Sequence, residues 1–145
     1  MAAPLRATVL VTDGAQRASL ATVRSLGKAG CTVHVVSSSG KSLAGASRYA
    51  AAEHVVTDPL QSDAAFADDL QRIASRIDAD LIIPIAEPSV LALLPRREIF
   101  GRARIPFVEA SSFARIADKA EVLAAAADVG IAVPAQHVVD RKSVV

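Results

Sequence analysis

The sequence has few of the residues that small domains use in place of a large core. It holds one cysteine, no tryptophan and only 3% aromatic residues. A single cysteine, Cys31, cannot form an internal disulfide, and the 3 histidines are too scattered to form a zinc site. The fold must therefore be stabilised by aliphatic packing in one core, for which 145 residues suffice.

Long hydrophobic runs and excess charge are also absent. Hydrophobic residues make up 52% of the sequence, but no apolar run approaches the roughly 20 residues that a membrane-spanning helix needs. The opening MAAPLRATVLVT lacks the successive regions of a secretory signal peptide. The net charge of +1 gives no broad attraction to nucleic acid or anionic lipid. We expect a cytoplasmic protein that binds neither nucleic acid nor membrane.

The sequence does contain a regular alternation of short β-branched runs and longer alanine-rich stretches. The predicted strands are 7–12, 32–37, 53–57, 80–86 and 105–109, and the predicted helices are 19–30, 64–77, 88–100 and 111–130. The strands are apolar at nearly every position, as parallel strands are when helices cover both faces of the sheet. The pattern predicts an α/β fold, a Rossmann-like three-layer domain with a parallel sheet.

The helix boundaries carry residue signals of their own. Gly30 and Gly130 stand where the first and last helices must end, because glycine adopts the left-handed conformation without strain. Pro88 suits the first turn of a helix. Asp118, with Glu121 three residues later, is typical of a capping box and predicts that a helix restarts there.

Two stretches are less regular. The residues between 37 and 53 are small and polar, and we expect a loop with a short helix. A further strand is predicted at 136–139, with no partner strand after it. We therefore expect the chain to stop part-way through a larger architecture.

Polar residues follow several of the predicted strands. In an open parallel sheet, ligands bind beyond the carboxyl ends of the strands. The residues predicted at that edge are Asp13, Gly14, Ser37–Ser39, Thr57, Asp58 and Glu87. The acidic residues among them have an alternative role as helix caps. Glu87 is the best functional candidate.

Two nucleotide-binding motifs are incomplete. A dinucleotide site needs G-x-G-x-x-G after the first strand, and TDGAQRAS supplies Gly14 alone, which argues against a small reductase. Gly40-Lys41-Ser42 resembles the end of a P-loop, but Val35 stands where the first glycine is required. We interpret this match as chance.

Other chemistry-bearing residues have plainer interpretations. Few aromatic residues accompany a local basic cluster, which is therefore interpreted as a solvated face and not as a nucleic-acid site. This cluster consists of Arg96, Arg97, Arg102 and Arg104. Cys31 and His34 belong to a predicted strand and are interpreted as packing residues, not as a nucleophile and its base. His54 and His137 have no partners in the sequence and are interpreted as structural.

Three segments together resemble the start of an ATP-grasp enzyme. They are VLVTDGAQRASLATVRSLGKAGCTVHVVSSS, DLIIPIAEPSVLALL and IADKAEVLAAAADVGIAVP. The chain is similar to the carbamoyl-phosphate-synthase large-chain-like ligases, in which a Rossmann-like pre-ATP-grasp domain precedes a helix that opens with Asp-Lys and ends with Gly-(Ile/Val)-x-x-Pro. The counterparts here are Asp118, Lys119, Gly130, Ile131 and Pro134.

This resemblance implies a domain division and a function. Residues 1–110 would form the pre-ATP-grasp domain, and 111–145 would begin a truncated ATP-grasp region. The family couples ATP hydrolysis to the joining of a carboxylate with an amine through an acylphosphate, with magnesium beside the transferring phosphate. The family's glycine-rich loop and magnesium carboxylates are missing after Pro134. We therefore expect an N-terminal ligase fragment that is inactive alone and binds no cofactor tightly.

The resemblance also implies roles for particular residues. Lys119 matches the basic residue that contacts the nucleotide phosphate, and Glu87 lies where the N-terminal domain faces the acceptor substrate. Asp13 and Gly14 are further candidate substrate-binding residues. The substrate would be a small carboxylate or amine. The alternative is a freestanding small-ligand-binding or regulatory module with a flavodoxin-like or Rossmann-like fold, and a homodimer would cover any exposed apolar face.

Overall fold

The computed structural model of the chain describes residues 5–135. These residues divide into two units, one that ends at Phe107 and one that begins at Val108, and each is described by itself. The strands of the first unit are β1 (Thr8–Val11), β2 (Thr32–Ser37), β3 (Ala50–Val55) and β4 (Leu81–Ile83). Its helices are α1 (Arg17–Lys28), α2 (Asp63–Arg76) and α3 (Glu87–Leu93), followed by the 3-10 helix η1 (Leu94–Phe100).

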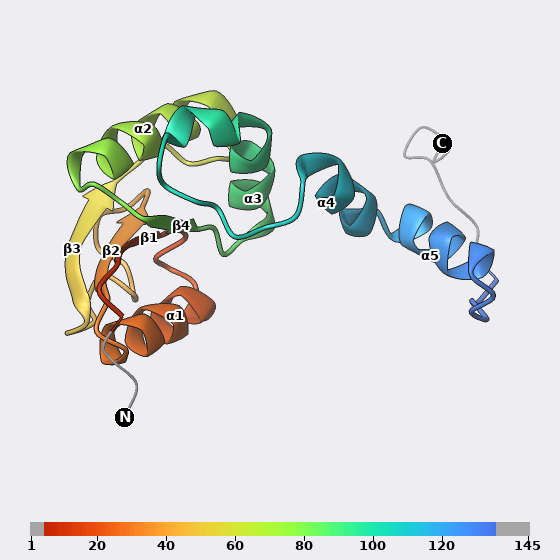
Figure 1. Cartoon of the computed structure of the whole chain (residues 1–145), viewed down its shortest axis with the longest axis horizontal. Coiled ribbons are helices and arrows are strands. Elements are labelled where there is room, and N and C mark those ends of the chain that lie inside the picture. The colour runs from red at the N-terminus through yellow and green to blue at the C-terminus, as the bar shows by residue number, and fades with distance from the viewer. Residues whose placement is uncertain (1–4, 136–145) are drawn as a thin grey trace, which may run out of the picture. The chain divides into compact units, whose positions relative to one another are not determined.

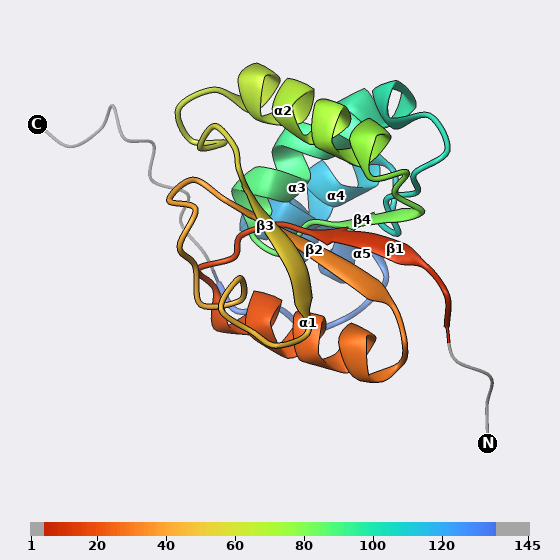
Figure 2. The ribbon, with the colours of Figure 1, turned by 90° about the vertical axis from the view of Figure 1, so that its left-hand side faces the viewer.

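The four strands form one parallel sheet in the order β3-β2-β1-β4. The register places Val9 beside Val33 on one side and Leu81 on the other. Helix α1 covers one face of the sheet, and α2 and α3 cover the other (Figures 1 and 2). The predicted α/β fold with three layers and a parallel sheet is confirmed.

The core is aliphatic and lies on both faces of the sheet. On the α1 face, Val9 and Val33 pack with Val23 of the helix, and all three are fully buried. Successive strand residues point to opposite faces, so Leu10 lies on the face that α2 covers, where Phe66 is buried. Burial of each such side chain stabilises the fold by roughly 1.5–3 kcal/mol. The two-sided core explains why the strands are apolar at almost every position.

The glycine signals at the helix ends are confirmed. Gly30 has φ 97° and Gly130 has φ 81°, both in the left-handed region. After α1, the Gly30 N–H donates to the Gly27 carbonyl at 3.2 Å, and the next N–H, that of Cys31, donates to the Leu26 carbonyl at 3.1 Å. These two bonds are the pattern of a Schellman motif, which satisfies carbonyls that the helix leaves without partners.

The region between β2 and β3 differs from the prediction in two ways. Turns replace the predicted short helix, and β3 begins at Ala50, three residues before the predicted start at Glu53. Alanine has a weak intrinsic preference for strands, so the start of β3 is set by its pairing with Val33 of β2. At the other side of the sheet, β4 ends at Ile83 because Pro84 has no N–H to donate.

The predicted fifth strand at 105–109 is wrong. Only an isolated bridge between Arg104 and Leu81 extends the sheet beyond β4 within residues 5–135. The Arg104 N–H donates to the Asp80 carbonyl at 2.9 Å, and the Ile82 N–H donates to the Arg104 carbonyl at 2.9 Å. Pro106 then removes the next N–H that such a ladder would need, so the pairing stops.

The predicted helix 88–100 is divided in two. Pro88 lies in the first turn of α3, as predicted. The α-helix ends at Leu93, and η1 begins at Leu94, directly before Pro95. A proline ring clashes with the preceding turn and lacks the N–H of the helical ladder, which accounts for the break.

The second unit consists of α4 (Ala110–Ala117) and α5 (Lys119–Asp128). The restart at Asp118 is confirmed, since its carboxylate accepts from the Ala120 N–H at 2.8 Å and the Glu121 N–H at 3.3 Å. The Asp118 N–H donates to the Ala114 carbonyl of α4, so it does not need the glutamate of a capping box. No residue of α4 or α5 is buried, and Ile116 is 62% exposed.

Some predictions remain outside these observations. The predicted strand at 136–139 and His137 lie outside the described residues. The division into a pre-ATP-grasp domain at 1–110 and the start of an ATP-grasp region at 111–145 stays a prediction. Within residues 5–135, no helix has the length and apolar character needed to cross a membrane.

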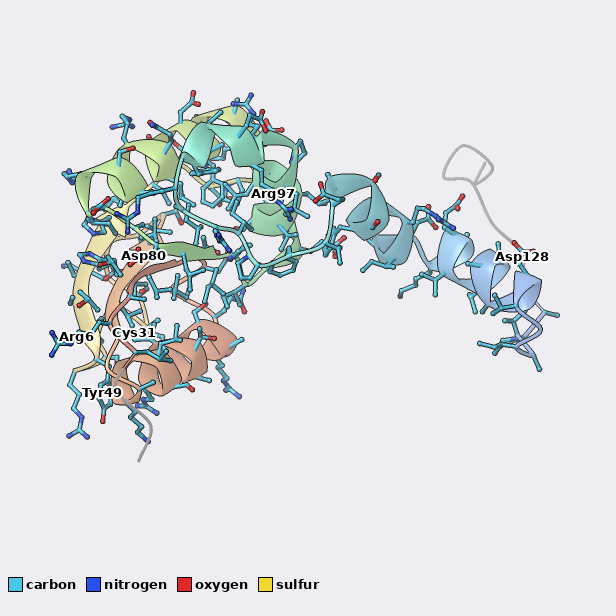
Figure 3. The ribbon with its side chains drawn as sticks, in the orientation of Figure 1. Arg6, Cys31, Tyr49, Asp80, Arg97 and Asp128 are labelled. Carbon is cyan, nitrogen blue, oxygen red and sulfur yellow. The ribbon has the colours of Figure 1, made fainter. Side chains whose placement is uncertain are left out.

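Gly27 provides a test of the packing between α1 and the loop before β3. A methyl group at Gly27 would lie 2.6 Å from Cβ of Tyr49, the residue labelled in Figure 3. Gly27→Ala should therefore lower the free energy of unfolding by about 1 kcal/mol or more, because overpacking at roughly 1–3 kcal/mol outweighs the gain in helix propensity.

The matched background for this test is Tyr49→Gly, because alanine at position 49 would keep the Cβ atom that the new methyl group meets. With the whole side chain removed, Gly27→Ala should raise the free energy of unfolding by about 1 kcal/mol, the usual difference between glycine and alanine inside a helix. Urea denaturation of the four proteins measures both effects. Stabilisation by Gly27→Ala in the presence of Tyr49 would contradict the packing argument.

Candidate functional site

A hollow of about 310 Å³ lies at the carboxyl ends of the strands. Its walls come from the β1–α1 turn, the ends of β2 and β3 and the start of α3. The predicted edge residues that line it are Asp13, Gly14, Ser37, Ser38, Ser39, Thr57 and Asp58. The parallel register therefore brings together residues that are up to 45 positions apart, from Asp13 to Asp58.

Glu87 lies in an adjoining hollow of about 390 Å³. The two hollows share Pro59, Leu60 and Pro88 in their walls. Glu87 is the first residue of α3, and its two neighbours in the chain, Ala86 and Pro88, line the first hollow. The best sequence candidate thus borders the edge site without lining its first hollow.

Asp13 holds the edge together through its carboxylate. Its Oδ2 accepts from the N–H of Ala86 at 2.9 Å and from the N–H of Ile85 at 3.2 Å, and its Oδ1 accepts from the Ser89 hydroxyl at 2.8 Å. The Thr12 hydroxyl also donates to Oδ2. Asp13 is not itself a helix cap, because the N-cap of α1 is Gln16 and the N–H groups of Ile85 and Ala86 precede the first residue of α3. Its contacts instead fasten the end of β1 to the start of α3.

The backbone of Asp13 is also unusual. Its φ of 57° lies in the left-handed region, which aspartate and asparagine tolerate better than most other non-glycine residues. This conformation turns the chain sharply after β1. The hydroxyl of Ser19 in α1 donates to the Asp13 carbonyl at 2.7 Å and to the Thr12 carbonyl at 2.9 Å, which anchors the turn from the helix side.

Gly14 permits a close approach between two loops. Its N–H donates to the Val36 carbonyl at 3.0 Å, and its carbonyl accepts from the Ala44 N–H at 2.9 Å. A Cβ atom at Gly14 would lie 2.8 Å from Cγ1 of Val35 and would also overlap the side chain of Ser42. Glycine is needed here for packing, and its backbone is engaged within the protein.

Glu53 is a structural residue of the edge that the sequence did not reveal. It was predicted only as part of a strand. Its Oε1 accepts from the Ser37 hydroxyl at 2.7 Å and from the Ser42 N–H at 3.0 Å. Burial raises the pKa of the Glu53 carboxyl, but the hydrogen bonds from Ser42 and Ser37 outweigh this effect and hold the pKa below its ordinary value. The carboxylate therefore fixes the loop that follows β2.

Thr57 is held in the same way by α2. Asp69 accepts from the Thr57 N–H at 2.7 Å and from the Thr57 hydroxyl at 2.8 Å. Burial raises the pKa of Asp69, and the bonds from Thr57, together with the nearby Arg72, lower it further than burial raises it. The hydroxyl of Thr57 is thus already used within the protein.

The two described histidines form a pair, so His54 has a partner in the fold that the sequence did not reveal, and the contact agrees with its interpretation as structural. His34 Nδ1 lies 2.9 Å from His54 Nε2, and Arg76 contacts His54 Nδ1 at 3.2 Å. Because arginine can only donate, His54 accepts at Nδ1 and donates from Nε2 to His34. Burial lowers the pKa of both rings, and Arg76 lowers both further. The pair is a neutral packing contact between β2, β3 and α2.

The basic cluster lies among acidic side chains of the surface. Arg102 forms ion pairs with Asp78, at 2.9 Å, and with Asp80, which Figure 3 labels. Arg96 lies 3.6 Å from Asp68. The side chain of Arg102 is 60% exposed, so these pairs contribute little to stability. The geometry fits the interpretation of a solvated face for Arg102 but not for Arg97, whose guanidinium donates to the Phe107 carbonyl at 2.6 Å and is partly buried.

Lys119 is the first residue of α5 in the second unit, and its side chain is exposed. It is followed by the two N–H groups that the carboxylate of Asp118 caps. Its predicted contact with a nucleotide phosphate stays a prediction.

No family model and no curated protein sequence matches the chain, but several solved structures do. Glycinamide-RNase-transformylase T from Mycobacterium tuberculosis has 23% identity, with a TM-score of 0.57 over 85% of this chain and 35% of that one. The biotin carboxylase domain of a single-chain bacterial carboxylase has 17% identity, with a TM-score of 0.61 over 86% of this chain and 29% of that one. Rhizobium etli pyruvate carboxylase has 18% identity, with a TM-score of 0.63 over 87% of this chain and 13% of that one.

These comparisons establish the fold. The chain shares a Rossmann-like α/β fold with part of each of these structures, which is the fold that the sequence resemblance implied. It spans about a third or less of the length of the structures it matches. At this level of identity the likeness extends to the fold alone.

The role of Asp13 can be tested by three substitutions. Asp13→Ala should lower the free energy of unfolding by about 2–4 kcal/mol, because it removes the acceptor of the Ala86 N–H and of the buried Ser89 hydroxyl and places at φ 57° a residue that tolerates this conformation less well than aspartate. Asp13→Gly removes the same hydrogen bonds without that strain, and it should cost about 1–2 kcal/mol less than Asp13→Ala.

Asp13→Asn is the matched control, because it keeps the backbone preference and one acceptor oxygen. It should be the least destabilising of the three in urea denaturation. Equal stability of all three variants and the wild type would show that the carboxylate does not fasten β1 to α3.

Glu53 predicts a specific acid dependence. Because its folded-state pKa lies below its ordinary value of 4.5, Glu53 stabilises the fold above that pH, and this contribution is lost as the pH falls through the folded-state pKa. Glu53→Gln should therefore be less stable than the wild type near pH 7. The difference should shrink as the pH falls below about 4.5. Denaturation curves between pH 3 and pH 7 measure it, and parallel profiles for the two proteins would contradict the assignment.

Proposed function

We propose that the chain is the substrate-side, N-terminal domain of an ATP-grasp ligase that joins a carboxylate to an amine. The observation that carries this proposal is the fold likeness to ATP-grasp enzymes over 85–87% of the chain. The hollow at the carboxyl edge of the sheet supports it, because ligands of open α/β sheets bind at that edge. Glu87, at the border of the two hollows, faces the acceptor substrate in this proposal.

The described residues do not fit a magnesium site. Within residues 5–135, no three His, Cys, Asp or Glu side chains are grouped so that they could hold a metal ion. Magnesium bound to ATP is held by acidic side chains beside the phosphates. In the proposed ligase, the metal and most of the nucleotide would therefore be bound by other parts of the protein, and Lys119 would supply a single cation to a phosphate.

A second candidate function has support from the hollow itself. A cavity of about 310 Å³ falls at the lower end of the roughly 300–1,000 Å³ typical of small-molecule sites. A freestanding binding or regulatory module, active in the cytoplasm without ATP turnover, would use the same edge. The two functions differ in whether the full-length protein consumes ATP when it is given a carboxylate and an amine.

Kinetics of the full-length protein test the ligase proposal. ADP release should depend on both a carboxylate and an amine substrate. Lys119→Ala should raise the KM for ATP about tenfold or more, because a hydrogen bond to a charged group is worth about 1.5–3 kcal/mol. Lys28→Ala, in the last turn of α1, is the matched control and should leave that KM unchanged.

Glu87→Gln tests the acceptor side of the same proposal. It should raise the KM for the acceptor or lower kcat, while the KM for ATP stays the same.

An unchanged KM for ATP in Lys119→Ala would show that Lys119 does not contact the nucleotide phosphate. ATP consumption that requires neither substrate would overturn the ligase in favour of another activity.

A further inference from the structure

The two adjoining hollows have apolar walls and charges of one sign. The walls contain the side chains of Val36, Val56, Phe66, Leu60 and Leu91 and two prolines, Pro59 and Pro88. The charged residues that line the hollows are Asp13, Asp58, Asp63 and Glu87. All four are acidic, and no lysine, arginine or histidine of residues 5–135 lines either hollow.

Two positive features oppose this acidic character. Helices α1 and α3 both begin at the first hollow, where their N-caps Gln16 and Ala86 make no side-chain capping bond. A helix N-terminus is equivalent to roughly half a positive charge, which by itself favours an anion. The carboxylates of Asp13 and Asp58 line the same hollow, and together they exceed the two half charges about twofold. The hollow is therefore a better environment for a cation than for an anion.

Asp58 differs from Asp13 in the use of its oxygens. Both oxygens of Asp13 accept hydrogen bonds within the protein. Asp58 Oδ1 accepts from the Leu60 N–H at 2.9 Å, and its Oδ2 has no partner among the described residues. The side chains of Gln16 and Ser38, which line the same hollow, likewise have no hydrogen-bond partner within residues 5–135. These three groups remain available to a ligand.

We propose that the first hollow binds a small primary amine with an apolar body, whose ammonium group lies at Asp58 Oδ2. The apolar walls would contact the body of the ligand, and Gln16 and Ser38 would bond its polar substituents. The inference rests on the proposed function and deepens it, because it assigns the edge of the sheet to the amine and not to the carboxylate or the nucleotide. A carboxylate or phosphate in this hollow would meet no side-chain cation and two carboxylates.

Binding to the chain itself tests this assignment. The probes are 3-methylbutylamine, its carboxylate analogue 3-methylbutanoate and inorganic phosphate, each titrated into the labelled chain at pH 7 and followed by NMR shifts of backbone amides. The amine should shift the amides of residues that line the first hollow, with an affinity at least about tenfold above that of either anion. Equal or stronger shifts of the same amides by an anion would overturn the assignment.

Asp58→Asn, compared with a substitution elsewhere, distinguishes the effect of the Asp58 carboxylate on amine affinity from the effect of the net charge of the chain. Asparagine keeps the oxygen that accepts from Leu60, so the turn is preserved, and the affinity for 3-methylbutylamine should fall about fivefold or more. Asp68→Asn, on the surface of α2 beside Arg96, removes the same charge elsewhere and should leave that affinity unchanged. Equal effects of the two substitutions, or none, would overturn the role of Asp58.

The outcomes distinguish this inference from the proposed function. If the full-length protein consumes ATP in the presence of a carboxylate and an amine, but the hollow prefers 3-methylbutanoate, the amine assignment fails and the ligase stands. If the hollow selects the amine through Asp58, but the full-length protein has no ligase activity, the assignment stands and the proposed function fails.

Discussion

The edge of the sheet depends on the carboxylate of Asp13. Strand β1 lies in the interior of the sheet, and the turn after it must lead into α1 while remaining in contact with the segment that follows β4. One carboxylate does this by accepting from the N–H groups of Ile85 and Ala86 and from Ser89. These are bonds between segments more than 70 positions apart. Together with the Thr12 N–H, which donates to the Ile83 carbonyl at 3.1 Å, they fix the start of α3 against β1.

The same kind of contact recurs at the neighbouring strand ends. Glu53 holds the loop after β2 through Ser37 and Ser42, and Asp69 holds the segment after β3 through Thr57. Each carboxylate accepts backbone N–H groups, and the pKa values of Glu53 and Asp69 are lowered accordingly. Such bonds fix the walls of the hollow before any ligand binds, which is how binding sites keep their geometry. Asp13, Glu53 and Asp69 are therefore structural residues of this edge.

Sequence patterns predicted the interior strands of the sheet better than the strands at its sides. The strands of the sheet interior are buried on both faces, so their continuous apolar runs were a direct signal, and β2 spans the predicted residues 32–37. The run at 105–109 has the same composition, but Pro106 ends its pairing after a single bridge. Because the carboxyl ends of parallel strands lie at one edge of a sheet, the sequence predicted that Asp13 and Asp58 lie close together, and both line the first hollow. The role of Glu53 depends on pairing between distant segments, and no local pattern reveals such contacts.

The long-range bonds of Asp13 have a consequence for the order in which the protein is made. Its hydrogen-bond donors end with Ser89, so the walls of the hollow are incomplete until that residue has left the ribosome. Strands β1 to β3 and helix α1 are all synthesised earlier, yet they provide only part of the site. A nascent chain that ends before Ser89 lacks part of the walls of the hollow, which are complete only when α3 has joined the fold.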